Sequence, residues 1–88
     1  MYGVEIKPSC QKNIEKLCKR NPVLAQILEK KMNEITQNPH HYKSLKYDLA
    51  GERRVHIMKS FVLKFMIHEN NQTVEFIMFD HHDEVYRR

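Results

Sequence analysis

The C-terminal segment FDHHDEVY brings histidine, acidic and tyrosine side chains close together in a chain of 88 residues. His81 and His82 are adjacent, and Tyr86 follows four residues after His82. A second group occurs earlier, where Arg54 and His56 are separated by one residue in RRVHI. Histidine transfers protons near neutral pH, and arginine binds phosphate oxygens through a fork of N–H donors. These residue types suit acid–base chemistry on a phosphodiester.

Cleavage of RNA by its own 2′-OH requires three kinds of group. A base must accept the hydroxyl proton, an acid must protonate the leaving 5′-oxygen, and cations must stabilise the phosphorane. An aromatic side chain can also stack on an unpaired base and hold the scissile bond in line. The side chains that supply these parts are His56, His81, His82, Arg54, Lys43, Lys46 and Tyr86. The pattern is therefore compatible with RNA cleavage that needs no metal.

Two other interpretations of the histidines remain open. The first is a metal site formed by His81, His82, Asp83 and His56. Adjacent histidines on an extended strand point to opposite faces, so both could bind one ion only if the chain turns there. The second is structural, with DHHDEV as a polar turn, Tyr86 packed over the sheet edge, and a function that consists only of binding a partner.

Composition predicts one folded domain over residues 1–88, with 41% apolar residues, 30% charged residues and two glycines. Cys10 and Cys18 are eight positions apart in one predicted helix, too far apart to form a disulfide, and we expect both to be reduced. Because reduced cysteines are typical of a reducing compartment, we expect a cytoplasmic protein. We also expect no membrane span and no cleavable leader, since the sequence shows neither pattern.

The net charge of +4 comes entirely from residues 1–44, because residues 45–88 hold equal numbers of basic and acidic side chains. This surplus fits either a solvated helical surface or an anionic partner, such as nucleic acid or an acidic protein.

Hydrophobic periodicity predicts the elements of the N-terminal half. MYGVEI alternates apolar and other residues, which indicates a short edge strand. A helix should follow from the N-cap Ser9 to about Arg20. A second amphipathic helix should begin at Asn21-Pro22 and end at Asn38-Pro39. The short link between the two helices predicts an antiparallel helical hairpin.

From residue 43 onward the period changes to two. Strands are predicted over 45–49, 53–57, 61–68 and 73–79, with turns at Ala50-Gly51 and in ENNQ. A strand, a helical hairpin and a three- to four-stranded antiparallel meander together make an α+β domain with the helices on one face of the sheet.

Strand parity predicts which side chains point to the face of the sheet that the helices leave uncovered. In ERRVHIMK, the apolar residues Val55 and Ile57 should face the helices. Arg54, His56 and Met58 should then point together to the opposite face. The basic group of the 53–57 strand and the histidines after the 73–79 strand thus become candidates for one site.

The run from Lys43 to the C-terminus resembles the RelE family of toxins from type II toxin–antitoxin systems, especially the members that use histidines, such as YafQ. The resemblance rests on the patterns L-x-x-x-L-x-G-x-x-R-V-H-I, then F-V-L opening a strand, then H-H-D-E-V-Y. With the N-terminal strand and helical hairpin, the resemblance covers essentially the whole chain. It implies a microbial-RNase-like RelE fold and an endoribonuclease that cleaves mRNA in the ribosomal A site without a metal or other cofactor.

The resemblance implies a role for individual residues. His56 matches a position involved in proton transfer or transition-state charge, and Arg54 matches a basic position that holds phosphate. Lys43 lies where histidine-using relatives have a catalytic imidazole. His82 matches their terminal histidine, and Tyr86 matches the aromatic residue that stacks on a base or assists the 2′-OH. Further contacts to RNA or phosphate are expected from Lys43, Lys46, Arg53, Lys59, Lys64 and His81.

This sequence departs from the family pattern in two places. Val62 occupies a strand position where many members have arginine, with Lys64 two residues on. The stretch before the final Glu-Val-Tyr, often basic in the family, is here the acidic and histidine-rich DHHD. Both differences remove fixed positive charge from the expected site.

The resemblance also implies partners. A small RelB-like antitoxin should wrap the toxin, in a toxin–antitoxin heterotetramer, and the 30S A site and mRNA should be the targets, with no membrane partner. Two alternatives stay open. One is a non-catalytic toxin that binds gyrase, as the ParE branch of the same fold does. The other is a decayed toxin that acts as a corepressor with its antitoxin.

Overall fold

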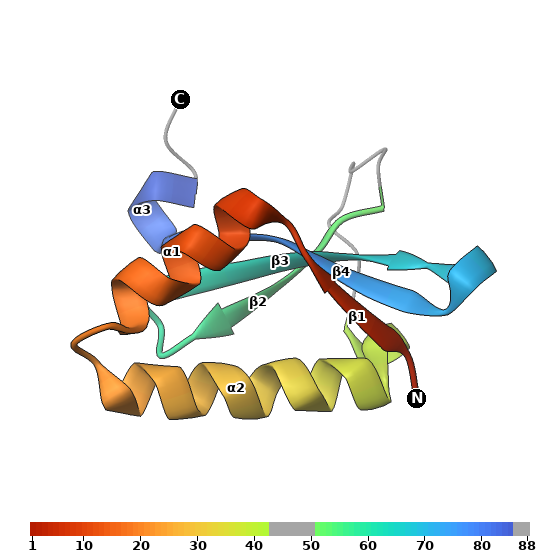
Figure 1. The fold of residues 1–88 in the computed structure, drawn as a ribbon, viewed down its shortest axis with the longest axis horizontal. Coiled ribbons are helices and arrows are strands. Elements are labelled where there is room, and N and C mark those ends of the chain that lie inside the picture. The colour runs from red at the N-terminus through yellow and green to blue at the C-terminus, as the bar shows by residue number, and fades with distance from the viewer. Residues whose placement is uncertain (43–50, 86–88) are drawn as a thin grey trace.

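The computed structural model of the chain describes residues 1–42 and 51–85. The element order begins with a strand, two helices and a short 3-10 turn, continues with a three-stranded meander and ends with a short helix (Figure 1). The elements are β1 (Gly3–Ile6), α1 (Pro8–Cys18), α2 (Pro22–Gln37), η1 (Pro39–His41), β2 (Arg53–Ile57), β3 (Phe61–His68), η2 (Glu69–Asn71), β4 (Thr73–His81) and α3 (His82–Val85).

The strands form one mixed sheet in the order β1-β4-β3-β2. The pairs β2–β3 and β3–β4 are antiparallel, which confirms the predicted meander, and β1 pairs with β4 in parallel from Gly3↔Thr73 to Ile6↔Phe76. The predicted α+β class is therefore correct. The predicted strand over 45–49 lies outside the described residues, as does Ala50 of the predicted turn.

The two long helices begin differently from each other. The N-cap predicted at Ser9 is wrong, because α1 starts at Pro8 and its N-cap position, Lys7, makes no side-chain capping bond. Proline suits the first helical position since its missing N–H has no partner there anyway. The α2 prediction is confirmed, because the side chain of Asn21 accepts a hydrogen bond of 3.1 Å from the backbone N–H of Leu24.

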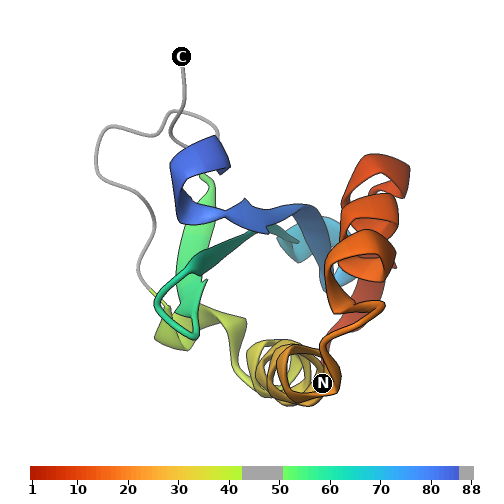
Figure 2. The ribbon, with the colours of Figure 1, turned by 90° about the vertical axis from the view of Figure 1, so that its left-hand side faces the viewer.

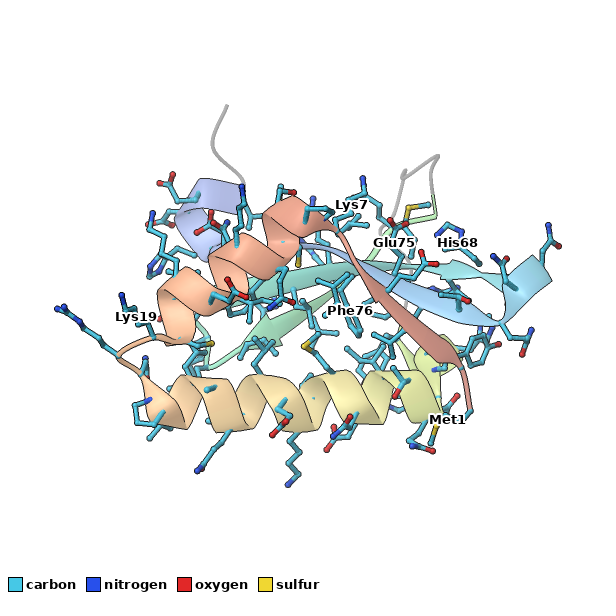
Figure 3. The ribbon with its side chains drawn as sticks, in the orientation of Figure 1. Met1, Lys7, Lys19, His68, Glu75 and Phe76 are labelled. Atoms are coloured by element: carbon cyan, nitrogen blue, oxygen red, sulfur yellow. The ribbon has the colours of Figure 1, made fainter. Side chains whose placement is uncertain are left out.

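The hydrophobic core lies between the sheet and the two long helices (Figures 1 and 2). Phe76 points toward α2, whereas His68 and Glu75 point to the other face of the sheet (Figure 3). The core residues are Cys10, Leu24, Leu28, Ile35, Ile57, Phe61, Leu63, Phe65, Val74, Phe76 and Phe79. The face opposite the core will be called the outer face of the sheet. No helix in the described part of the chain is long and apolar enough to cross a membrane.

The end of the sheet differs from the sequence prediction. Strand β4 continues to His81, two residues past the predicted end, and His82 then begins α3. The short helix lies on the side of the sheet away from α2 (Figures 1 and 2). There it packs against β3 and β4. Val62 of the outer face is fully buried at this end of the sheet. The chain thus turns at the histidine pair and brings the second histidine over the outer face.

Candidate active site

The rings of His56 and His82 stack on each other. Their centroids are 5.5 Å apart and their planes differ by 25°. His56 comes from β2, where it pairs with Val62 of β3, and Val62 pairs in turn with Asp80 of β4. Because paired residues share a face, His56 belongs to the outer face. His82 reaches that face because α3 turns over it.

A hollow of about 440 Å³ adjoins this histidine pair. The side chains around it come from β2, the β2–β3 turn, the end of β4 and α3, four segments that only the folded sheet brings together. The residues that line it are His56, Lys59, Ser60, His81, His82 and Asp83. The lining therefore combines three imidazoles, one ammonium, one hydroxyl and one carboxylate. Such groups can donate and accept protons and contact an anionic substrate.

His82 is held by contacts on both its backbone and its side chain. Its backbone N–H donates a hydrogen bond of 2.7 Å to the carbonyl oxygen of Ser60. Its Nδ1 lies 3.7 Å from Oδ1 of Asp83, and its side chain is 46% exposed. The ring is therefore fixed beside His56 but still accessible to a ligand.

His81 has a different environment from His82. Its ring lies 4.6 Å from the ring of Phe61, and Phe61 stacks on Phe79 at 5.6 Å. His81 thus extends an aromatic row at the end of the core, and its backbone N–H donates a hydrogen bond of 2.8 Å to the carboxylate oxygen Oδ1 of Asp80. Although both histidines border the hollow, only His82 contacts the ring of His56.

The predicted basic residues of β2 and β3 separate into two groups. Arg54 is exposed on the outer face, two residues before His56, and lies opposite Lys64 in the register of β2 and β3. Lys64 forms an ion pair of 3.6 Å with Glu52. Arg53 has the opposite parity, and its guanidinium donates to the backbone carbonyl oxygen of Tyr42. Arg53 is therefore engaged in a backbone contact away from the outer face.

The remaining predicted residues divide into those outside the described part of the chain and those in or after β2. Lys43, Lys46 and Tyr86 lie outside the described residues. Lys59 lies in the β2–β3 turn and borders the hollow. Met58, expected to share the strand face of Arg54 and His56, is instead the first residue after β2 and has a positive φ of 54°.

The metal interpretation finds no support in the described part of the chain. Within residues 1–42 and 51–85, no group of three or more His, Cys, Asp or Glu side chains is arranged to hold a metal ion. The rings of His56 and His82 stack on each other, whereas metal ligation needs their ring nitrogens to converge on one point.

Sequence reasoning missed Ser60 and the role of Phe61. Ser60 lines the hollow and its carbonyl oxygen accepts from His82, and Phe61 forms the surface on which His81 stacks. Ser60 lies between the predicted strands 53–57 and 61–68, and this position in a turn was the available signal that it lies at the end of the sheet. Nothing in the sequence indicated that its carbonyl oxygen contacts the N–H of His82.

Comparisons with known proteins agree with this architecture. Residues 4–86 match the ParE toxin family of type II toxin–antitoxin systems. A protein of Methanocaldococcus jannaschii designated RelE4 is 54% identical over 88 residues, which cover all of this chain and 94% of that protein. The chain therefore belongs to the ParE toxin family, within the RelE/ParE superfamily of type II toxin–antitoxin toxins.

Solved structures share the fold over nearly the whole chain. A metal-bound toxin from Helicobacter pylori matches with a TM-score of 0.81 and 23% identity, covering 98% of this chain and all of that one. The toxin–antitoxin complex RelBE2 of Mycobacterium tuberculosis contains a chain that matches with a TM-score of 0.72 and 25% identity, covering 91% of this chain and 96% of that one. The predicted RelE fold is thereby confirmed.

Proposed function

We propose that this toxin is an endoribonuclease that cleaves mRNA by acid–base catalysis, with His56 and His82 as the proton-transfer pair. The observation that supports this proposal most directly is the stacking of the two imidazoles, 5.5 Å apart, beside an accessible hollow. Histidine is the side chain whose unperturbed pKa suits both accepting and donating a proton near neutral pH. A pair of histidines at one site can therefore supply both proton transfers.

The reaction begins when one histidine accepts the proton of the 2′-OH while the 2′-oxygen attacks the adjacent phosphorus. The bond from phosphorus to the 5′-oxygen breaks, and the other histidine, protonated, gives its proton to that oxygen. The products are a cyclic phosphate and a 5′-hydroxyl. The attacking and leaving oxygens lie on opposite sides of phosphorus, so each of the two imidazoles beside the hollow serves a different oxygen.

Positive charge at the hollow would stabilise the phosphorane. Lys59 borders the hollow directly, and Arg54 is exposed on the same outer face as His56. An ammonium or guanidinium lowers the barrier because it stabilises the negative charge on the phosphate oxygens more in the transition state than in the ground state. We assign Lys59 and Arg54 to this role, and by family resemblance we assign base stacking to Tyr86.

The proposed target is mRNA in the ribosomal A site, and the proposed partner is a RelB-like antitoxin in a heterotetramer. These assignments rest on the resemblance to RelE toxins. The structural likeness to the toxin in the RelBE2 complex of Mycobacterium tuberculosis supports an antitoxin partner. The antitoxin would block the outer face or move α3, since His82 begins that helix.

The experiment is translation in vitro with purified protein, followed by mapping of mRNA ends. The proposal is supported if the wild type cleaves mRNA within codons on translating ribosomes and His82→Ala does not. Uncut mRNA with full inhibition of protein synthesis contradicts it. Cleavage that EDTA abolishes, and that magnesium alone cannot restore on resupplied ribosomes, would indicate a bound transition metal.

A second candidate function is non-catalytic binding of gyrase, which the match to the family named for ParE favours. Such a toxin has no need of a histidine pair. Inhibition of DNA supercoiling by the purified protein, together with intact mRNA, would establish this alternative. Absence of growth arrest on expression, with antitoxin binding retained, would instead indicate the third possibility, a decayed toxin that serves as a corepressor.

A further inference from the structure

The β2–β3 turn has a backbone conformation that its sequence does not favour. Met58 and Lys59, neither of them glycine, have φ values of 54° and 65°. Two successive residues in the left-handed region are unusual because the Cβ atom approaches the following carbonyl oxygen. Asn, Asp and Gly tolerate this region much better. The turn is therefore strained.

Packing does not explain the strain. The side chain of Met58 is 44% exposed, and Lys59 and Ser60 are also exposed. Ile57 and Phe61 are the last paired residues of β2 and β3 before the turn. Within the turn, the N–H of Ser60 donates to the carbonyl oxygen of Met58 at 2.6 Å. Strain of this kind persists where the surrounding structure determines it, and it is concentrated at functional sites.

The contact of this turn with the candidate site supplies a reason for the strain. The carbonyl oxygen of Ser60 accepts the backbone N–H of His82 at 2.7 Å, at the residue where the chain leaves β4 and enters α3. Two left-handed residues immediately before Ser60 determine the direction of that carbonyl. The residue that this carbonyl contacts is the one whose ring stacks on His56.

We propose that the turn Met58–Ser60 is a positioning element, whose left-handed backbone directs the Ser60 carbonyl at the His82 N–H and so holds His82 against His56. This inference rests on the proposed function only for its effect on catalysis. The geometric part can be tested without any RNA cleavage. Met58 acts through the backbone and does not line the hollow, so it is a positioning residue and not a catalytic one.

The matched variants are Met58→Val and Met58→Asn. Valine is β-branched and strongly disfavours the left-handed region, whereas asparagine adopts it readily. Because Met58 is exposed and lies outside the hydrophobic core, neither change removes core packing. Circular dichroism verifies that each variant is folded, and Met58→Ile replaces Met58→Val if the latter does not fold.

Amide hydrogen exchange tests the geometry. We expect the His82 amide to be protected in the wild type and in Met58→Asn, and to exchange at least about tenfold faster in Met58→Val. In parallel, the ring resonances of His82 should shift when His56 is replaced by alanine in the wild type, and shift far less in the Met58→Val background. An unprotected His82 amide in the wild type, or equal protection in all variants, overturns the inference whatever the protein does to RNA.

Kinetics test the consequence for catalysis. Met58→Val should lower kcat for mRNA cleavage by about tenfold or more, with KM within about threefold of the wild-type value. Met58→Asn should keep the wild-type kcat. In the His82→Ala background, Met58→Val should have no further effect on kcat. An equal loss with and without His82 would show that the turn acts only on stability. If the wild type cuts no RNA, the proposed function fails while the exchange measurement still decides the positioning inference.

Discussion

The ring of His81 lies against Phe61, with 4.6 Å between the ring centroids, although its neighbour His82 stacks on His56. Phe61 is a core residue with 8% exposure, whereas His56 is exposed on the outer face. The change from β4 to α3 between these adjacent histidines places the ring of His81 against the core edge and the ring of His82 against His56. This relationship divides the candidate roles of the pair.

Replacement of His82 by alanine should lower the rate of mRNA cleavage at least about a hundredfold, the usual loss when an acid–base group is removed. His81→Phe should retain most activity because a phenyl ring preserves the ring contact with Phe61. The measurement is single-turnover cleavage on translating ribosomes. Equal losses in the two variants would contradict the division of roles, and wild-type rates in His82→Ala would exclude His82 from catalysis.

Lys59 and Lys64 provide a matched comparison of basic residues. Lys59 borders the hollow, whereas Lys64 is paired with Glu52 at 3.6 Å. Lys59→Gln should therefore lower kcat/KM for RNA cleavage about tenfold, the value of one lost charge-assisted contact, and should reduce the salt dependence of kcat/KM. Lys64→Gln should have a smaller effect on both quantities. The kcat/KM of each variant across a series of salt concentrations checks this prediction, and a larger effect at Lys64 would refute it.

Much of the fold could be predicted from the sequence because hydrophobic periodicity records which face of each element is buried. The period of two over 53–57 and 61–68 gave both strands with their observed bounds, and Asn21 with Pro22 gave the start of α2. The parity of Arg54 and His56 followed from the same pattern. The parallel pairing of β1 with β4 was not predicted, since pairing depends on how the helical hairpin returns the chain to the sheet.

The candidate site was only partly predictable. Sequence parity indicated that His56 faces away from the helices, but it could not indicate that the chain turns between His81 and His82. That turn depends on tertiary contacts, including the bond from His82 to Ser60, which leave no local signal. The same limitation applies to Arg53, whose contact with the carbonyl oxygen of Tyr42 depends on where η1 lies.

The different helix starts predict different costs of mutation. Asn21→Ala should lower the free energy of unfolding by about 1 kcal/mol, since it removes the side-chain acceptor for the N–H of Leu24. Ser9→Ala should change it by less than about half as much, because Ser9 follows Pro8 inside the first turn and does not cap α1. Urea denaturation of both variants measures the difference. A larger loss at Ser9 would indicate that the helix begins where the sequence pattern suggested.

The two cysteines should differ in reactivity. Burial raises the pKa of the Cys10 thiol from 9.0 to about 11, and Cys10 is only 2% exposed. Burial also raises the pKa of Cys18, which is less buried. Since the thiolate is the reactive species, its fraction at pH 8 in Cys10 is about a hundredfold below that of an unperturbed thiol. Alkylation of Cys18→Ser, which retains only Cys10, should therefore be much slower in the folded state than in urea, and slower than alkylation of Cys10→Ser.

The same shift predicts a loss of stability in alkaline solution. The folded state holds the Cys10 proton more tightly than the unfolded state, so its contribution to stability is complete below pH 9 and declines as the pH rises toward 11. Lysines and tyrosines titrate in this range as well, which makes Cys10→Ala the necessary reference. The free energy of unfolding should fall more steeply between pH 9 and 11 in the wild type than in Cys10→Ala, measured by urea denaturation at each pH. Parallel slopes would mean that the folded protein exposes the Cys10 thiol to solvent.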